Sequence, residues 1–350
     1  MAKSTAFSTG ATAYETASTA RSNDAEERAW RRALAEAIRD PLDLVERLRL
    51  PADLAGKARR AARTFALLVP ESFLARMQPG DPADPLLRQV LPLEAEDTPA
   101  DGYVADPLRE ASVTEAPGLL RKYDGRALLV ATGACAIHCR YCFRRHFPYE
   151  GVPKGLAAWE PALQAIAEDQ SIEEVILSGG DPLVLPDHAL RSLIERLDVV
   201  RHIRTIRVHT RLPVVLPERV TGELLRTLRA TRSTIVVVLH ANHAAELSGD
   251  CAAAIERLAA ERMIVLNQAV LLRGVNDSQE ALADLSRRLV ELRVLPYYLH
   301  QLDPVAGAAH FHVPESRGRE LIEELRATLP GYAVPRHVRE EPGAASKIAL

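Results

Sequence analysis

The feature that most constrains the fold is an alternation of short apolar runs with amphipathic stretches, which begins near residue 127. Six runs have the length and composition of strands: 127–132, 174–178, 205–209, 234–240, 264–271 and 295–300. Helical periodicity fills the intervals, near 160–169, 187–198, 218–230, 249–261 and 278–292, and returns near 315–328. Strands that alternate with helices indicate parallel βαβ units.

We therefore predict an α/β fold in which six units form an open, partial (β/α)6 barrel, with a doubly wound open sheet as the alternative. Both arrangements place a ligand site at the C-terminal ends of the strands. Polar and reactive residues follow the predicted strands at this edge. They are Cys135 after the first strand, Gly179, Gly180 and Asp181 after the second, His209 and Arg211 at the third, Asn242 after the fourth and Asp303 after the sixth.

The rest of the 350-residue chain divides by composition. Residues 1–24 are rich in Ser, Thr and Ala with little charge, and we predict a disordered tail there. A helix start at Asn23 and several proline-punctuated helical runs predict a helical and irregular extension over 25–116. The barrel core is expected over 117–330, and a separate C-terminal segment over 331–350.

Overall charge and hydropathy exclude some classes of protein. The net charge of −3 argues against a protein built around a nucleic-acid backbone. No apolar stretch approaches the roughly eighteen residues needed to span a bilayer. Without a secretory signal, the cysteines are expected to be reduced, so we predict a cytoplasmic location.

Three of the four cysteines, Cys135, Cys139 and Cys142, lie in a C-x3-C-x2-C spacing. Thiolates clustered in this way suit one metal centre. Three ligands leave one iron of a cubane cluster free to bind a small molecule. A structural zinc site completed by His138 or His146 is the alternative. A disulfide is also considered, although close neighbours pair awkwardly. Cys251 stands alone in an Ala-rich helical stretch and fits a small buried apolar residue.

Basic residues near the cysteines have two interpretations. Arg144 and Arg145 form a solvated basic turn, or they clamp a carboxylate with two parallel hydrogen bonds. Lys122, Tyr123 and Arg126 precede the first strand and are positioned to reach a phosphate at the barrel mouth.

The chain ends with a Pro-Gly stretch that contains Lys347, three residues from the terminus. Composition alone favours an ordinary tail lysine. A Schiff-base lysine must lose its proton, which requires desolvation or a cationic neighbour. The tail would then have to fold back over the barrel mouth.

Taken together, these segments resemble the lysine 2,3-aminomutase family of radical S-adenosylmethionine (SAM) enzymes over roughly residues 26–350. The resemblance rests on DPLLRQV at 84–90, PGLLRKY at 117–123, the cysteine run through Arg145, LSGGD at 177–181 and EEPGAASK at 340–347. It is strongest toward the branch that modifies translation elongation factor P. For that branch the segments are CRYCFRRHFPY at 139–149, HTRLPVVLP at 209–217 and LLRGVND at 271–277.

The resemblance implies three cofactors. A [4Fe-4S] cluster would be held by Cys135, Cys139 and Cys142, and Lys347 would carry pyridoxal 5′-phosphate (PLP) as a Schiff base. The PLP phosphate would lie near Lys122, Tyr123 and Arg126. SAM would be held by Ser178, Gly179, Gly180, Asp181, His209 and Asn242, although isolated polar groups at a barrel rim are common.

The resemblance also implies the substrate. Arg144 would hold the carboxylate of lysine, and Asp303 its ε-ammonium. A second acid is expected seven residues before Lys347, where this chain has Glu340 and the free-lysine enzymes have aspartate. The activity implied is conversion of L-lysine to (R)-β-lysine for β-lysylation of elongation factor P, with a link to that factor and its lysyl-ligase. An aminomutase of free lysine or another amino acid is the alternative, and a homo-oligomer is possible.

Overall fold

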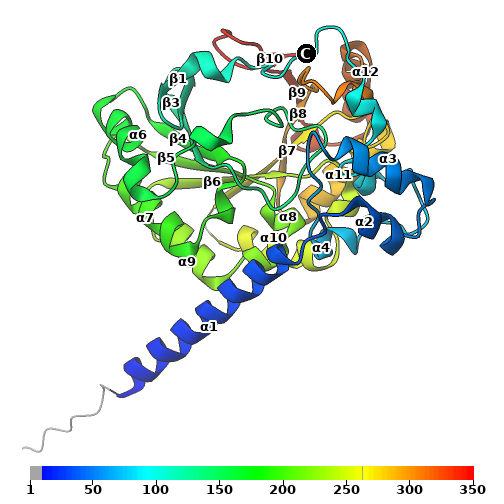
Figure 1. Ribbon diagram of the computed structural model, residues 1–350. Helices are drawn as coiled ribbons and strands as arrows, with labels where there is room; N and C mark the ends of the chain where they lie inside the picture. Colours follow the sequence, from blue (N-terminus) through cyan, green and yellow to red (C-terminus); the bar gives the residue numbers. More distant parts are fainter. Residues whose placement is uncertain (1–9, 262) are drawn as a thin grey trace, which may run out of the picture.

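The computed structural model describes residues 10–261 and 263–350, which form one sheet of ten strands in the order of the chain, β1 to β10 (Figure 1). From β3 to β9 each strand runs parallel to the next, while β1, β2 and β10 pair antiparallel at the edges. The parallel strands are Arg126–Thr132 (β3), Glu174–Gly179 (β4), Thr205–Thr210 (β5), Thr234–His240 (β6), Ile264–Val270 (β7), Leu295–His300 (β8) and Arg336–Arg339 (β9). The edge strands are Thr114–Ala116 (β1), Leu119–Tyr123 (β2) and Ile348–Ala349 (β10).

The predicted strands are present as β3 to β8, each within one residue of its expected bounds. Their sequential order contradicts the doubly wound alternative, because that arrangement reverses the strand order at a switch point. The prediction of six strands was incomplete, since it missed the edge strands and the parallel β9. These strands have two to five residues, which is too short for a clear period-2 pattern.

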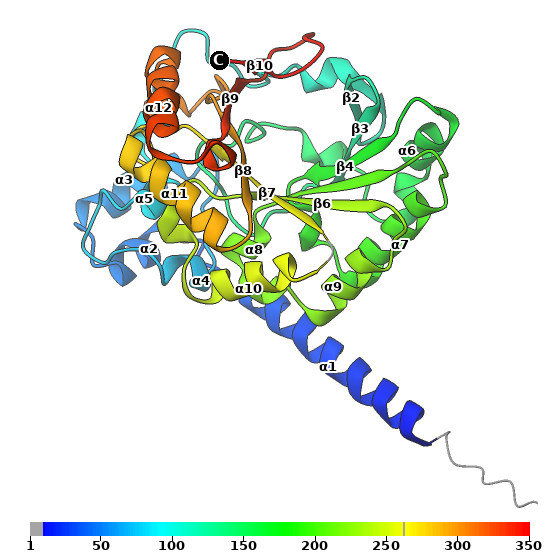
Figure 2. The same cartoon turned by 180° about the vertical axis from the view of Figure 1, so that it is seen from behind.

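Helices cover the outer face of the sheet (Figures 1 and 2). They are Leu156–Glu168 (α6), Asp187–Asp198 (α7), Gly222–Arg229 (α9), Gly249–Ala259 (α10), Gln279–Glu291 (α11) and Glu315–Thr328 (α12). The short helix Leu212–Val215 (α8) directly follows β5. In α7 the buried residues Leu190, Leu193, Ile194 and Leu197 recur at helical spacing, so one apolar face meets the sheet. The bounds of α7 and α12 agree with the sequence prediction.

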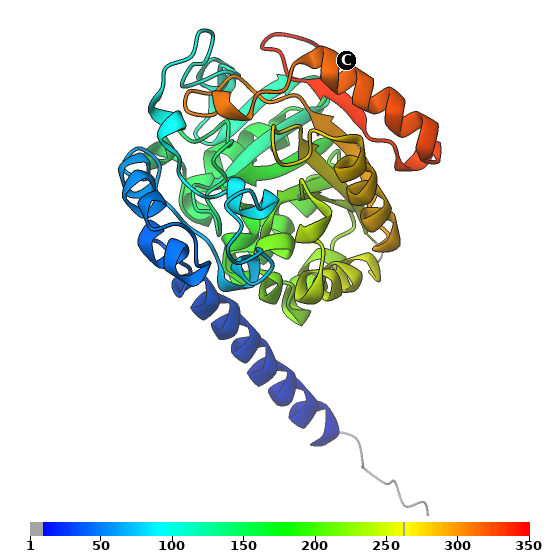
Figure 3. The ribbon, with the colours of Figure 1, turned by 90° about the vertical axis from the view of Figure 1, so that its right-hand side faces the viewer.

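The N-terminal extension packs on one flank of the sheet (Figure 3). Its helices are Pro41–Arg47 (α2), Asp53–Ala61 (α3), Glu71–Leu74 (α4) and Pro85–Arg88 (α5). Phe73, Leu86 and Leu87 are fully buried in the same hydrophobic cluster as Leu129 of β3 and Val175 of β4. The extension therefore shares the core of the sheet, and it delivers side chains to the cysteine loop.

The first helix, Gly10–Ala35 (α1), projects from the body (Figures 1 and 3). Its C-terminal half is anchored, because Trp30 is buried and the Glu26 carboxylate accepts a hydrogen bond from Gly222 N at 2.8 Å. We predicted a disordered tail over 1–24, but the helix begins at Gly10, and residues 1–9 lie outside the described part. The segment has no proline, so a helix that is anchored at one end can extend through it. Over residues 10–261 and 263–350, no helix combines the length and apolar character needed to cross a bilayer.

The C-terminal segment returns to the sheet after β9. Ile348 pairs with Arg339 and Ala349 with Val338, and Leu350 N donates to His337 O at 3.0 Å. This pairing fixes the last residues of the chain and positions Lys347, which directly precedes β10.

Candidate active site

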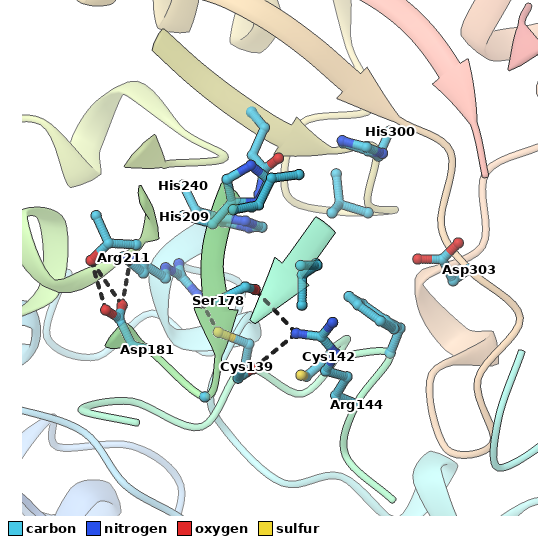
Figure 4. A pocket seen from close by; sticks show the side chains of 18 of the residues that line it. Cys139, Cys142, Arg144, Ser178, Asp181, His209, Arg211, His240, His300 and Asp303 are labelled. Carbon is cyan, nitrogen blue, oxygen red and sulfur yellow. Dashed lines mark hydrogen bonds between the residues drawn. The ribbon is translucent and has the colours of Figure 1, made fainter. Parts of the chain in front are cut away.

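A cavity of about 600 Å³ lies within the curve of the sheet, between the cysteine loop and the C-terminal segment (Figure 4). This volume falls in the range of small-molecule sites. The cavity brings together nearly all the predicted site residues. They are Lys122, Tyr123, Arg126, Cys135, Cys139, Cys142, Arg144, Ser178, Gly179, Gly180, Asp181, His209, Asp303, Glu340 and Lys347.

The three clustered cysteines all have free thiols that line this cavity. Burial raises the pKa of Cys135, and it raises the pKa of Cys142 to about 12. Metal binding at these sulfurs must therefore displace protons. The fourth cysteine, Cys251, is also free, but it lies in α10 and is buried in the hydrophobic core, as predicted. A set of three thiols around one cavity fits a cluster that keeps one iron for an external ligand.

The zinc alternative gains no support from the histidines near the loop. His138 Nδ1 lies 2.9 Å from the carbonyl of Ala66, and His146 Nε2 lies 3.0 Å from the carbonyl of Ala306. Among the described residues, no group of three His, Cys, Asp or Glu side chains is arranged to hold a single metal ion.

Gly179 and Gly180 allow the end of β4 to pack against the start of the cysteine loop. A Cβ atom on Gly179 would lie 2.3 Å from the Thr132 carbonyl oxygen, and one on Gly180 only 2.2 Å from that of Ala134. Gly179 also has a φ of +124°, which side chains disfavour. We predicted that these two glycines allow a ligand to approach the backbone closely. The structure shows that the chain's own backbone already requires them.

Asp181 joins the ends of β4 and β5. Its carboxylate accepts hydrogen bonds from the backbone N–H groups of Leu183, Arg211 and Leu212 and from the Thr210 hydroxyl, at 2.6–3.2 Å. Burial raises its pKa to about 6. These bonds give Asp181 a clear role in holding the two strand ends together.

Asn242 is the predicted residue that the structure places differently, because it does not line the cavity. Its Nδ2 donates to Gln89 Oε1 at 2.9 Å and to the Tyr141 hydroxyl at 2.7 Å, and its Oδ1 accepts from Val270 N at 2.8 Å. The structure therefore places Asn242 behind the cavity wall, and direct contact of Asn242 with SAM stays a prediction.

Arg144 is buried and paired rather than solvated. Its Nε and Nη2 donate to the two carboxylate oxygens of Glu110 at 2.7 and 2.8 Å. Its Nη1 donates to Ser178 Oγ and Gly179 O, both at 3.1 Å (Figure 4). Burial by itself would raise the pKa of the Glu110 carboxyl. The positive charges of Arg144 and Lys122 outweigh this effect and hold the pKa below its usual value. Sequence reasoning missed Glu110, which lies in an irregular segment without a motif.

The lysine end of the cavity continues this pairing with alternating charges. Lys122 Nζ lies 3.0 Å from carboxylate oxygens of both Glu110 and Glu340, and Glu340 also binds Lys347. Burial by itself would raise the pKa of Glu340, but the positive charges of Lys347 and Lys122 lower it to about 2. The fold therefore joins Arg144, Glu110, Lys122, Glu340 and Lys347 in one continuous series of ion pairs.

Asp303 lies across the cavity from Asp181 and Arg211 (Figure 4), near the charges of the lysine end but outside this series of ion pairs. Burial, followed by repulsion from Glu340, raises its pKa to about 7. Among the described residues no cation forms an ion pair with its carboxylate. A buried carboxylate of this kind is suited to receive an ammonium group from a ligand.

The groups around Lys347 also fit an aromatic aldehyde phosphate. Two histidines lining the cavity, His209 and His300, have buried Nε2 atoms without a hydrogen-bond partner among the described residues. Burial lowers the pKa of both, that of His300 to about 3, so both rings are neutral at pH 7. Arg126, whose guanidinium lies 5.5 Å from the Tyr123 ring, supplies a cation for a phosphate. These residues fit PLP held by Lys347.

Comparison with known proteins gives two kinds of match. A family model described as the radical SAM superfamily matches residues 129–247, which include the cysteine loop and β4 to β6. Curated relatives match most of the chain. L-lysine 2,3-aminomutase of Haemophilus influenzae is 43% identical over 92% of this chain and 95% of that protein.

Two further relatives carry the same name. L-lysine 2,3-aminomutase of Escherichia coli strain K12 is 44% identical over 92% of this chain and 94% of its own length. The protein of that name from Clostridium subterminale is 33% identical over 93% of this chain and 78% of its own length.

Proposed function

The chain belongs to the lysine 2,3-aminomutase family of radical SAM enzymes, which are isomerases, and we propose that it converts L-lysine to (R)-β-lysine with PLP as a second cofactor. One observation carries the proposal. A single cavity is lined both by three clustered thiols and by a lysine amine that returns from the C-terminus. A radical formed at the cluster must reach a substrate held at the lysine amine, so both sites must open into the same cavity.

Each cofactor has candidate residues in the cavity. Cys135, Cys139 and Cys142 would hold the [4Fe-4S] cluster, and SAM would bind its free iron beside Ser178, Gly179, Gly180, Asp181 and His209. Lys347 would hold PLP, with Lys122, Tyr123 and Arg126 near its phosphate. When bound, these groups supply the radical and the electron sink that amino migration requires.

The chain's own residues position the substrate between these cofactors. Arg144 would hold the lysine carboxylate and Asp303 its ε-ammonium, which fixes both ends of the substrate. Glu110, Ser178 and Gly179 already occupy four of the five N–H groups of Arg144. The substrate carboxylate would therefore share Arg144 with Glu110. Glu340 lies close to Lys347 and would add a second acid near the distal amine.

Two finer proposals concern architecture and biological role. The sequential strand order supports an incomplete (β/α)6 barrel whose open side is narrowed by the C-terminal segment.

Resemblance of residues 139–149, 209–217 and 271–277 to the branch that modifies elongation factor P supports a role in its β-lysylation, beside a lysyl-ligase. A cytoplasmic location and a homo-oligomer remain predictions from the sequence. The competing proposal is an aminomutase of free lysine or another amino acid in metabolism.

The test is anaerobic reconstitution with iron and sulfide, followed by incubation with SAM, PLP, a reductant and L-lysine. We expect SAM cleavage and (R)-β-lysine, identified by chiral chromatography. Protein that holds zinc in place of iron and sulfur, or that fails to cleave SAM, would contradict the proposal. Transfer of the product to purified elongation factor P by its lysyl-ligase, compared with transfer of L-lysine, separates the two biological roles.

A further inference from the structure

We propose that Arg211 is a positioning residue that sets the reduction potential of the cluster through a charged hydrogen bond to Cys139. The inference rests on the proposed function, because it assumes that the three cysteines hold a [4Fe-4S] cluster. No role for Arg211 follows from the cysteine spacing, since it lies more than sixty residues from the loop.

The contact between Arg211 and Cys139 is direct. Arg211 follows β5, and its guanidinium reaches back under the cysteine loop (Figure 4). Its Nη1 donates to Cys139 Sγ at 2.7 Å and to the Tyr141 hydroxyl at 2.8 Å. None of the other charged side chains in the described chain donates a hydrogen bond to a sulfur of the loop.

Surrounding groups hold the guanidinium in this position. Nη2 donates to Gln89 Oε1 at 2.6 Å and to Glu246 Oε2 at 2.9 Å. Glu246 is completely buried and is itself fixed by Asn242 N at 2.9 Å and Gln89 Nε2 at 3.0 Å. Movement of Arg211 away from Cys139 would leave Glu246 as an unpaired buried charge, which is strongly unfavourable. The hydrogen bond to sulfur is therefore a fixed feature of the site.

A fixed cation beside a cluster ligand changes the energy of reduction. Reduction adds one negative charge to a centre that already carries three thiolates, and a cation or N–H donor stabilises the reduced form. Arg211 therefore raises the potential. Glu246 lies on the other side of the guanidinium and partly cancels its field, so it lowers the potential.

These opposite contributions define a test in which the two partners give shifts of opposite sign. Arg211→Gln removes the cation, and Glu246→Gln removes its counter-charge with nearly the same shape. A buried pair elsewhere supplies the matched control. Arg219 and Asp187 are also buried and lie 2.8 Å apart, but they do not line the cavity. Arg219→Lys perturbs a buried ion pair without touching the loop.

The experiment is an anaerobic redox titration of the reconstituted proteins without SAM, followed by electron paramagnetic resonance of the reduced cluster. Iron and sulfide content are measured for each protein. We expect a more negative midpoint potential for Arg211→Gln, a less negative one for Glu246→Gln, and no change for Arg219→Lys. Equal potentials in wild type and both site variants, or shifts of the same sign, would overturn the inference.

If Arg211→Gln is the only variant that fails to hold the cluster, the potentials of Arg211→Lys and Glu246→Gln decide the test. Arg211→Lys keeps the charge but loses the planar fork, so its shift should be negative and smaller. A wild-type protein that holds no [4Fe-4S] cluster would contradict the proposed function itself. The two failures are thus distinguishable.

Discussion

The two ends of the cavity are built in different ways. At the cysteine end, all three thiols come from one loop of eight residues, 135–142. At the lysine end, the residues come from four separate segments: Glu110, Lys122, Asp303, and the C-terminal segment with Glu340 and Lys347. The ion pairs there join residues up to 218 positions apart. The comparison teaches that a local motif can define a cluster site, whereas the amine site depends on long-range folding.

The two ends also differ in their electrostatics. The thiols lie in a buried environment that raises the pKa of Cys135 and Cys142. The lysine end consists of alternating charges that neutralise one another in the absence of ligands. We therefore expect the two ends to respond independently when one of them is removed.

The largest effect is expected from removing one end completely. Cys142→Ala should abolish SAM cleavage while the visible absorbance of the PLP imine is retained. Lys347→Ala should abolish that absorbance and aminomutase activity while iron and sulfide content stay at wild-type values. Spectra and metal analysis of both variants check the prediction. If either variant loses both cofactors, the two ends are coupled and the comparison fails.

A large effect is also expected from Arg144→Lys, because Arg144 connects the two ends. A lysine cannot make two parallel bonds to Glu110 and also reach Ser178 and Gly179. We expect roughly a tenfold to hundredfold loss of kcat/KM for lysine. Unfolding should become easier by about 1–3 kcal/mol, because hydrogen bonds to buried charged groups are lost. Steady-state kinetics and thermal unfolding measure the two effects, and near-parental turnover would remove Arg144 from the site.

The pH dependence should report Asp303. Its pKa is raised from 3.8 to about 7, so the carboxylate is protonated below pH 7 and loses its attraction for an ammonium group. We expect kcat/KM for lysine to fall as pH drops through about 7. The raised pKa means that the folded state holds the proton more tightly than the unfolded state. Protonated Asp303 therefore stabilises the fold at low pH, and this contribution is lost as pH rises from about 4 to 7.

Asp303→Asn is the matched variant for this pH effect, since it is neutral throughout. Its kcat/KM should be low and should show no inflection near pH 7. An inflection that persists unchanged in Asp303→Asn would assign the titration to another group, of which Asp181, with a pKa raised by burial to about 6, is the first candidate.

The smallest effect is expected from Glu340→Asp. The shorter side chain can contact Lys122 or Lys347 but not both, which costs about one hydrogen bond of roughly 1 kcal/mol. We expect about a fivefold rise in KM for lysine, with the PLP absorbance unchanged. A lower KM than wild type would instead show that the shorter acid fits the distal amine better.

Much of the fold could be predicted from the sequence. The strands from β3 to β8 and the helices α7 and α12 are long enough to show their periodicity, so their bounds were close to correct. The edge strand β2 and the pair β9 and β10 were not found in this way, because strands of two to five residues are too short to show a clear period-2 pattern. α1 was placed too late because alanine, serine and threonine favour disorder by composition but do not forbid a helix.

The residues of the candidate site also divide into those that the sequence could predict and those that it could not. The cysteine spacing and Asp303, which follows a predicted strand, were accessible to sequence reasoning. Arg211 was expected only at the ligand edge of the strands, and Glu110 was not singled out, because an arginine at a strand end and an isolated acid in a loop are common in any protein. Their importance depends on burial and on their partners, Arg144 and Cys139.

By itself, the sequence determined the alternation of parallel strands with helices and the edge at which the reactive groups gather, since side-chain periodicity and chain direction are local properties. It also determined the three-thiol set, because eight residues of one loop stay close in any fold. Only the tertiary structure decided that Lys347 enters the same cavity, that Glu110 links Arg144 to Lys122, and that Arg211 meets Cys139. The physical reason is that buried ion pairs form between segments which only the folded sheet brings together.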